Sequence, residues 1–406
     1  MVFRRNSDST ANARITSPAF TRPPSPHVTT SRPTTSRPTT SRPTTKLSLA
    51  AAVATAGALT LSAGFAGAAS ASTSVHHAAA RAAQSGSKRV GIADPDLITK
   101  SAQVQASELV SMKALGITSI RLDADWSGVQ YGGPASFSWA PLDRVVHSVL
   151  AAGMSVDLII DGCPAWAAAA GTSGDVSPPP ASPAQYAAFA AKVAARYAPL
   201  GVTMFEIWNE PNNAGFWSPK PNPAAYTADL KAAYASIKHV DRSAFVISAG
   251  LAPEANDGTN INAVTFLQDM YAHGAKGSFN AVGYHPYSYP ALPDTYESWS
   301  GWSQMGHTSP SIRSVMTSNG DAAKQIWVTE VGAPTGGPDG VSQAAQGTDL
   351  SQAITNTKST SWIGGIYLYS WQDEGTDPTN DEDWFGVVTV TGAHKDSYKA
   401  VAAAIK

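Results

Sequence analysis

The chain has 406 residues and a formal net charge of −2, which conceals two unlike parts. Residues 1–89 carry 11 Lys and Arg and 1 acidic residue, whereas residues 90–406 carry 17 Lys and Arg against 29 Asp and Glu, a net charge of −12. An acidic folded part argues against a nucleic acid partner. The chain has 1 cysteine, which excludes an intrachain disulfide and a cysteine-based metal site.

The first 46 residues have the composition of a disordered leader. They are rich in Ser, Thr, Pro and Arg, and the pentapeptide SRPTT occurs there three times in tandem. Such a composition cannot bury a hydrophobic core. We therefore expect no folded domain before residue 47.

Residues 47–71 have the features of a signal peptide. No charged residue occurs from Leu47 to Val75, and the apolar run ends in Ala69-Ser70-Ala71, the small-x-small form of a signal-peptidase site. The sequence thus predicts a secreted protein, with residues 72–87 as an Ala- and Ser-rich linker. The alternative is an uncleaved membrane anchor with the protein on the extracellular face, because the run is long enough to span a bilayer.

Residues 88–406 are predicted to form one α/β domain. Apolar runs of the kind found in buried parallel strands recur eight times, at 88–94, 117–123, 155–161, 202–208, 244–250, 279–285, 325–330 and 365–371. Helical patterns lie between them, such as Tyr186, Phe189 and Val193 at spacings of three and four. Eight such units favour a (β/α)8 TIM barrel over an open doubly wound sheet, and no G-x-G-x-x-G motif supports the latter.

Two acidic residues lie at the carboxyl ends of predicted strands of this barrel. Glu210 follows Asn209 after the fourth strand, and Glu330 ends the seventh. The carboxyl ends of barrel strands carry the chemistry of such enzymes, and their side chains face a common mouth. Retaining glycosidases need two carboxyls about 5 Å apart, which this placement allows.

The motifs WNEPN and VTEVGAP resemble the acid/base and nucleophile motifs of glycoside hydrolase clan A, the retaining (β/α)8 glycosidases. Arg121 in SIRLDADW resembles the second-strand arginine of the clan, His285 and Tyr287 in YHPY its sixth-strand H-x-Y, and Trp371 its eighth-strand tryptophan. The resemblance covers about residues 88–406. Within the clan, DGCPAWAAAA and WVTEVGAPT look most like family 39 and next like family 5.

The resemblance implies an O-glycosyl hydrolase that needs no cofactor and acts on a polysaccharide or oligosaccharide by double displacement. Glu210 would be the acid/base and Glu330 the nucleophile. Arg121 would keep the Glu330 carboxylate ionised, and His285 and Tyr287 would orient it or donate to it. Alternatively, Arg121 could only satisfy a buried acid such as Asp123, and His285 with Tyr287 could be a hydrogen-bonded core pair.

Other residues are candidates for binding sugar. Asn209 would bond the sugar 2-OH, and Trp371 would form the floor under the reacting ring or simply fill the barrel top. Three further tryptophans follow predicted strands and could build sugar subsites or anchor loops: Trp126, Trp166 and Trp217. Trp208 is expected in the core.

Two further features have alternative interpretations. The acidic run 377–384 could bind calcium, although such runs are more often solvated loops, and we expect no metal site. Cys163 is expected to be a buried thiol. A noncatalytic carbohydrate-binding protein of the cell surface and a transglycosylase are the alternatives to hydrolysis.

Overall fold

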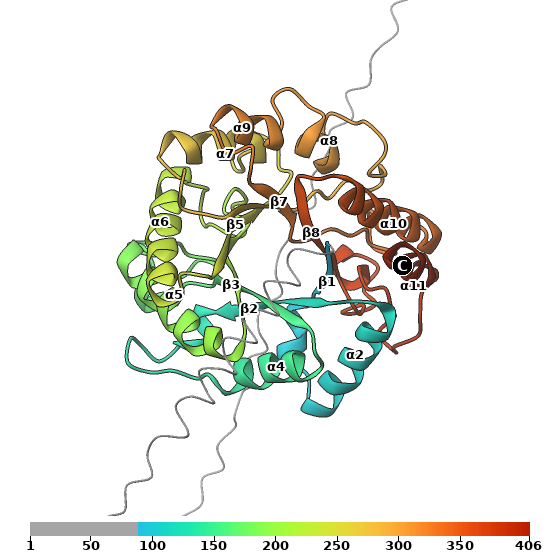
Figure 1. Cartoon of the computed structure of the whole chain (residues 1–406), viewed down its shortest axis with the longest axis horizontal. Helices are drawn as coiled ribbons and strands as arrows, with labels where there is room; N and C mark the ends of the chain where they lie inside the picture. Colours follow the sequence, from blue (N-terminus) through green and yellow to red (C-terminus); the bar gives the residue numbers. More distant parts are fainter. Residues whose placement is uncertain (1–87) are drawn as a thin grey trace, which may run out of the picture.

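The computed structural model describes residues 88–406, and the predicted leader, signal segment and linker lie outside them. Eight parallel strands form a closed barrel in chain order, with β8 paired to β1. Figure 1 looks onto this ring of strands, and the helices lie outside it. The predicted TIM barrel is confirmed. The strands are β1 (Arg89–Ala93), β2 (Ser119–Asp125), β3 (Ser155–Asp161), β4 (Met204–Asn209), β5 (Phe245–Leu251), β6 (Ala281–Tyr284), β7 (Gln325–Val328) and β8 (Ile363–Tyr369).

Each strand falls on a predicted apolar run, with ends shifted by a few residues. The helices are α2 (Ala102–Leu115), α3 (Trp126–Val129), α4 (Ala140–Ala151), α5 (Pro183–Tyr197), α6 (Pro223–Val240), α7 (Ala263–Ala272), α8 (Gly301–Gly306), α9 (Ile312–Ser318), α10 (Gln343–Ser359) and α11 (Asp396–Ile405). Among residues 88–406, none of these helices is long and apolar enough to cross a membrane.

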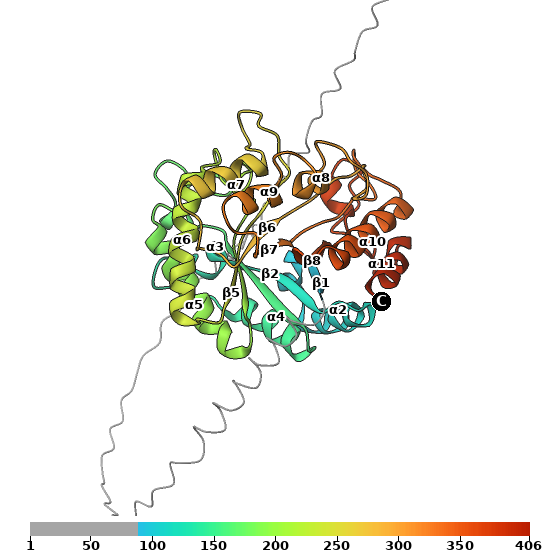
Figure 2. The same ribbon diagram turned by 45° about the horizontal axis from the view of Figure 1, so that its top comes forward.

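Local sequence explains where several helices begin. The Ser101 hydroxyl accepts a hydrogen bond from the Val104 amide and caps α2, and the Asn222 side chain caps α6 in the same way. Pro183 and Pro223 occupy the first helical position of α5 and α6, where a missing N–H costs nothing. In Figure 2, α11 lies beside α10 and next to α2, so the last helix completes the ring around the barrel.

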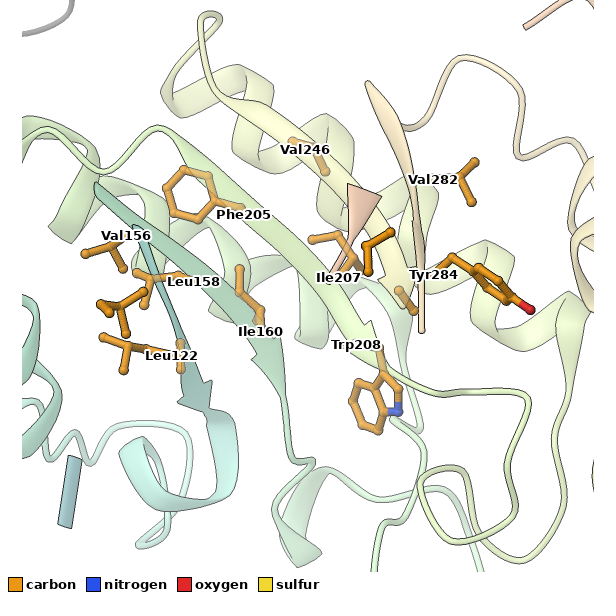
Figure 3. Close-up of a cluster of buried hydrophobic side chains, with 14 of the residues drawn as sticks. Leu122, Val156, Leu158, Ile160, Phe205, Ile207, Trp208, Val246, Val282 and Tyr284 are labelled. Carbon is orange, nitrogen blue, oxygen red and sulfur yellow. The ribbon is translucent and has the colours of Figure 1, made fainter. Parts of the chain in front are cut away.

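Two apolar layers hold the fold. The outer core lies between strands and helices, and Figure 3 shows part of it: Leu122, Val156, Leu158, Ile160, Phe205, Ile207, Trp208, Val246, Val282 and Tyr284. The inner core fills the barrel with Ala93, Met204, Ile247, Ala281, Trp327 and Tyr367, with Phe245 and Tyr369 packed against it. Alternate strand residues face these two layers. Polar residues that share the inner face therefore have to pair with one another, and they build the site described next.

Candidate active site

The end of β4 departs from strand alternation. Ile207 and Trp208 are consecutive, yet both lie in the outer core. Trp208 has φ 71° and Glu210 has φ 42°, values that side chains other than glycine rarely adopt. This strained backbone turns both Asn209 and Glu210 toward the barrel mouth, where their hydrogen-bond partners lie. Strain of this kind typically persists where it serves a functional site.

The two predicted catalytic carboxyls lie close together. One oxygen from each of Glu210 and Glu330, together with a ring nitrogen of His285, lie within 4.8 Å of one another. The His285 Nδ1 is 2.7 Å from Glu210 Oε1, and the Tyr287 hydroxyl donates to Glu330 Oε2 at 2.9 Å. Carboxyls from β4 and β7, 120 residues apart in sequence, thus share one small space.

Arg121 of β2 links this pair to a third acid. Its guanidinium donates to Glu330 Oε1 at 2.6 Å, to Glu206 Oε2 at 2.7 Å and to Asn209 Oδ1 at 3.0 Å. Only 4% of Arg121 is exposed. Burial opposes its charge, but the adjacent carboxylates of Glu206 and Glu330 raise the pKa of Arg121, so it stays a cation. It is therefore a fixed positive charge beside Glu330.

Thr329 and His285 form a relay from Glu206 to Glu210. The Thr329 hydroxyl donates its one proton to Glu206 Oε1 at 3.0 Å, so at 3.1 Å its oxygen accepts from His285 Nε2–H. Burial lowers the pKa of His285, and the neutral ring then carries a lone pair on Nδ1. The short contact from Nδ1 to Glu210 consequently requires the proton on Glu210. This assignment of tautomers follows from the hydrogen-bond partners.

The two glutamates have unlike environments. Burial, followed by the negative charge of Glu330, raises the pKa of Glu210 well above its ordinary value, although Arg121 acts against this. Burial also acts to raise the pKa of Glu330, but attraction to His285 and Arg121 and hydrogen bonds from Tyr287 and Arg121 bring it below the ordinary value. Since His285 is neutral near neutral pH, Arg121 supplies the positive charge. One carboxyl is thus protonated while the other is ionised, as acid–base chemistry requires.

A family model described as cellulase (glycosyl hydrolase family 5) matches residues 92–366. The chain belongs to this family. It therefore belongs to glycoside hydrolase clan A. The resemblance to the clan is confirmed, and the matched family is the one that the motifs placed second. No curated protein matches the chain in sequence.

Solved glycosidase structures share the fold of this hydrolase. A family 39 glycoside hydrolase from Bacteroides cellulosilyticus WH2 has a TM-score of 0.62 at 21% identity, over 78% of this chain and 64% of that one. This hydrolase thus spans less than two thirds of that protein. A GH5_18 enzyme from Streptomyces cattleya in complex with GlcNAc has a TM-score of 0.58 at 18% identity, over 79% of this chain and 80% of that one. A family 1 β-glucosidase from Thermotoga maritima has a TM-score of 0.53 at 14% identity, over 78% and 97%.

The predicted sugar-binding role is wrong for three of the tryptophans. Trp126 and Trp217 are each 1% exposed, because Trp126 stacks on Phe189 of α5 and Trp217 packs against Trp208. Trp371 is 3% exposed and contacts Tyr398 of α11, because β8 ends before it and its ring enters the outer core. These rings have no free face for a sugar.

The fourth candidate, Trp166, is half-buried. Its indole donates to the Gln130 carbonyl at 2.8 Å, and its ring meets Trp126 edge-on. Since part of the ring is exposed, its sugar-binding role stays a prediction. Trp208 is in the core, as expected, and donates to the Phe216 carbonyl.

Tyr369 was missed from the sequence and occupies the position proposed for Trp371. It lies two residues after Tyr367 in β8, so it faces the barrel interior, and it is half-buried at the mouth. Its hydroxyl donates its one proton to Glu382 Oε2 at 2.9 Å, and Glu374 Oε1 lies 3.3 Å from the hydroxyl oxygen. A period of two would put Tyr369 and Trp371 on the same face, so the two rings are separated by the end of β8 at Tyr369.

Glu206 and Thr329 were also missed. Both are fully buried, Glu206 within β4 and Thr329 directly after β7. An acid inside an apolar strand, such as Glu206, is the signal that a cation must face it. Gly250 of β5 makes room for this network, because a Cβ there would collide with His285 and Thr329. The Gly250 amide also donates to Glu206 Oε1 at 2.8 Å.

Neither the acidic run nor the cysteine adds chemistry to this site. In the run, Asp377 Oδ1 accepts from the Thr379 amide and Asp383 Oδ2 accepts from the Asp377 amide, so these oxygens fold the loop. Burial, then the charge of Asp229, raises the pKa of Cys163 to about 12, and 4% of Cys163 is exposed. Within residues 88–406, Glu210, His285 and Glu330 are the one close set of metal-ligand side chains, and Arg121 would repel a cation there.

Proposed function

We propose that the chain is a retaining glycosidase that uses Glu210 as acid/base and Glu330 as nucleophile. The observation that carries this proposal is the separation of the two carboxyls, whose nearest ligand oxygens lie within 4.8 Å. Retaining enzymes hold their carboxyls about 5–5.5 Å apart, whereas inverting enzymes leave about 6.5–9.5 Å for a water. The space here fits direct attack by a carboxylate.

In the first step, a Glu330 oxygen forms a bond to the anomeric carbon while the bond from that carbon to the leaving oxygen breaks. Glu210 gives its proton to the leaving oxygen. In the second step, Glu210 takes a proton from water, the water oxygen bonds to the anomeric carbon, and Glu330 leaves as a carboxylate. The two steps restore both groups and the original anomeric configuration.

The remaining polar groups support these steps. Arg121 and Tyr287 hold Glu330 ionised and fix its direction of attack. Asn209, held by Arg121, would present its amide to the sugar 2-OH, a contact that strengthens in the transition state. Tyr369 would lie under the reacting sugar ring, since aromatic faces pack well on apolar sugar faces.

The stereochemistry of the first product tests the mechanism. Proton NMR spectra recorded during the first minutes of hydrolysis should show the anomer that the substrate had, before mutarotation mixes the two forms. A matched panel of plant and microbial polysaccharides and aryl glycosides would supply a cleavable substrate. An initially inverted product would remove Glu330 from the role of nucleophile.

The relay through Thr329 gives a pH-dependent prediction. Thr329→Val removes the acceptor of His285 Nε2–H, so the ring can instead carry its proton on Nδ1 and donate to an ionised Glu210. This hydrogen bond to the ionised form lowers the pKa of Glu210. Because activity needs protonated Glu210, the basic limb of the kcat/KM profile should move to lower pH by about one unit, which corresponds to the free energy of one hydrogen bond.

Thr329→Ser, which keeps the hydroxyl, is the matched control and should leave the basic limb in place. The measurement is kcat/KM against pH on one aryl glycoside. A profile in Thr329→Val that falls in height without moving along the pH axis would show a merely structural role for the hydroxyl.

We further propose that the protein is exported by residues 47–71, which lie outside the described residues. The support is in the sequence, an uncharged apolar run that ends in Ala69-Ser70-Ala71. Expression of the full chain in a secreting host should release a protein whose first residue, by N-terminal sequencing, is Ser72. Recovery of the whole chain in washed membranes would instead support the anchor.

A further inference from the structure

An acidic cavity lies on the barrel rim beside the proposed active site. Its volume is about 240 Å³, far more than one water needs. The loops that follow the neighbouring strands β1 and β8 form it, so it opens at the carboxyl end of the barrel, as the two glutamates do. Its lining residues are Asp94, Pro95, Asp96, Thr99, Lys100, Ser370, Gln372, Asp373, Glu374 and Val390.

Negative charge predominates in this cavity. Asp373 is neutralised by Lys395, whose Nζ lies 2.6 Å from its carboxylate, and both are buried. Lys100 directs its ammonium at Glu108, with contacts of 2.9 and 3.1 Å to the two carboxylate oxygens. The carboxyls of Asp94, Asp96 and Glu374 therefore outnumber the cations around them, and burial raises the pKa of Glu374 to about 7.

Asp94 has a buried carboxylate oxygen that no donor of the cavity lining satisfies. This residue is 4% exposed, and its Oδ2 accepts no hydrogen bond from residues 88–406. The nearest cation is Lys100, whose Nζ is 3.9 Å from Oδ2, beyond hydrogen-bond distance. Burial raises the pKa of Asp94 to about 6, with Lys100 acting against it. A buried carboxylate oxygen without a donor is costly, and a ligand that brings an N–H group would offset that cost.

Tyr369 and Glu382 connect the cavity to the catalytic pair. The Tyr369 hydroxyl contacts Glu374 on the cavity side and Glu382 on the other. Glu382 in turn is near enough to feel the charges of Glu330 and Glu210. Acidic side chains therefore continue from the proposed active site, through Glu382 and Glu374, to the cavity.

The spacing of these acids suits an organic cation better than a metal ion. Calcium takes 6–8 oxygens at about 2.3–2.6 Å. In the part of the chain that the structure describes, the acids of the cavity form no set of three with closely placed ligand atoms. An ammonium group needs fewer partners, because it has three donors that each satisfy one oxygen. A sugar ring that carries such a group would also fill the volume.

We propose that this cavity binds a sugar unit with a free, protonated amino group, and that the glycan this enzyme cleaves contains such amino sugars. The proposal rests on the proposed function, since the cavity is a binding subsite of that active site. Asp94, Asp96 and Glu374 receive the ammonium group, and the excess negative charge of the rim attracts a cationic polymer. N-acetylation removes the positive charge and two of its donors, so acetylated sugars lose this contact.

Binding of matched tetrasaccharides tests the proposal. The probes are the β-1,4-linked tetramer of glucosamine and its fully N-acetylated form, titrated by calorimetry into the full chain carrying Glu330→Gln to prevent cleavage. The amine form should bind at least about tenfold more tightly at low salt, and the preference should shrink as salt screens the charges. The added pair Asp94→Asn and Glu374→Gln should abolish the preference.

Asp396→Asn, which removes one exposed negative charge on α11, is the control. It should keep the preference for the amine form, whereas a preference caused only by the overall negative charge of the protein would fall in this variant as it does in the cavity variants. If Asp94→Asn prevents folding, Asp96→Asn with Glu374→Gln makes the same test nearer the solvent. Equal or weaker binding of the amine form, or a preference that survives the cavity variants, would overturn the proposal. The proposal would also be overturned if calcium alone raised the Tm of the protein and this rise were lost in the cavity variants, because the cavity would then be a metal site.

Turnover by the unsubstituted enzyme separates this proposal from the function on which it rests. Selective binding of the amine tetramer without hydrolysis of any glycan or aryl glycoside would leave the cavity assignment in place and remove the double displacement. Hydrolysis of neutral glycans with no preference for amines would keep the double displacement and remove the cavity assignment.

Discussion

Glu330→Gln should lower kcat/KM for every glycoside by at least about 10⁴-fold, because an amide cannot form the covalent glycosyl intermediate. Losses of this size or larger follow removal of a nucleophile from enzymes that work by covalent catalysis. The substitution keeps the shape of the side chain, and Arg121 keeps its ion pair with Glu206. The fold should therefore persist, with an unchanged circular dichroism spectrum.

Glu297→Gln is the matched control, since this glutamate is exposed in the loop after β6 and its replacement should leave kcat/KM within about twofold. A second measurement identifies the attacking atom. A 2-deoxy-2-fluoro glycoside should inactivate the unsubstituted enzyme and leave its sugar on the peptide that contains Glu330. A Glu330→Gln enzyme that retains a tenth of its activity, or a label on another residue, would refute the assignment.

The strands and the glutamate pair were predictable because both depend on local patterns. Buried parallel strands must be apolar over most of their length, so each of the eight appears as a short run. The polar residue that ends such a run lies at the barrel mouth by topology alone, which is why Glu210 and Glu330 could be brought together from opposite parts of the sequence. Arg121 and Tyr287 contact Glu330, as the clan resemblance implies, whereas the hydrogen bond of His285 goes to Glu210.

The aromatic residues were harder to place because residue type alone does not show which way a side chain points. Trp126 and Trp217 follow strands, as sugar-binding residues do, yet their loops fold back onto α5 and Trp208, where burying a large ring is favourable. Trp371 was chosen over Tyr369 by residue type, whereas the end of β8 at Tyr369 decides which ring faces the mouth. The departure from alternation at Trp208 depends on φ, which no local pattern in the sequence specifies.

Glu210→Ala should act on the leaving group rather than on the nucleophile. For glycosides whose leaving group needs a proton, kcat/KM should fall by about 10²–10⁴-fold, the usual contribution of a positioned acid. For 2,4-dinitrophenyl glycosides the loss should be within about tenfold, because that leaving group departs as an anion. Since burial and the charge of Glu330 hold the proton on Glu210, the basic limb of the pH profile should also disappear in this variant.

Azide distinguishes loss of the acid/base from general damage to the site. In Glu210→Ala the small anion can enter the space of the missing side chain, attack the glycosyl intermediate without a base, and give a glycosyl azide with the configuration of the substrate. Glu254→Ala is the comparison, because Glu254 is a nearby acid whose oxygens accept from the side-chain amides of Asn213 and Asn260. Its variant should keep the ordinary dependence on leaving group and form no azide product. If Glu254→Ala showed the azide reaction and Glu210→Ala did not, the acid/base would have to be assigned to Glu254, and the relay from Glu206 through Thr329 and His285 would end on a residue without a role in proton transfer.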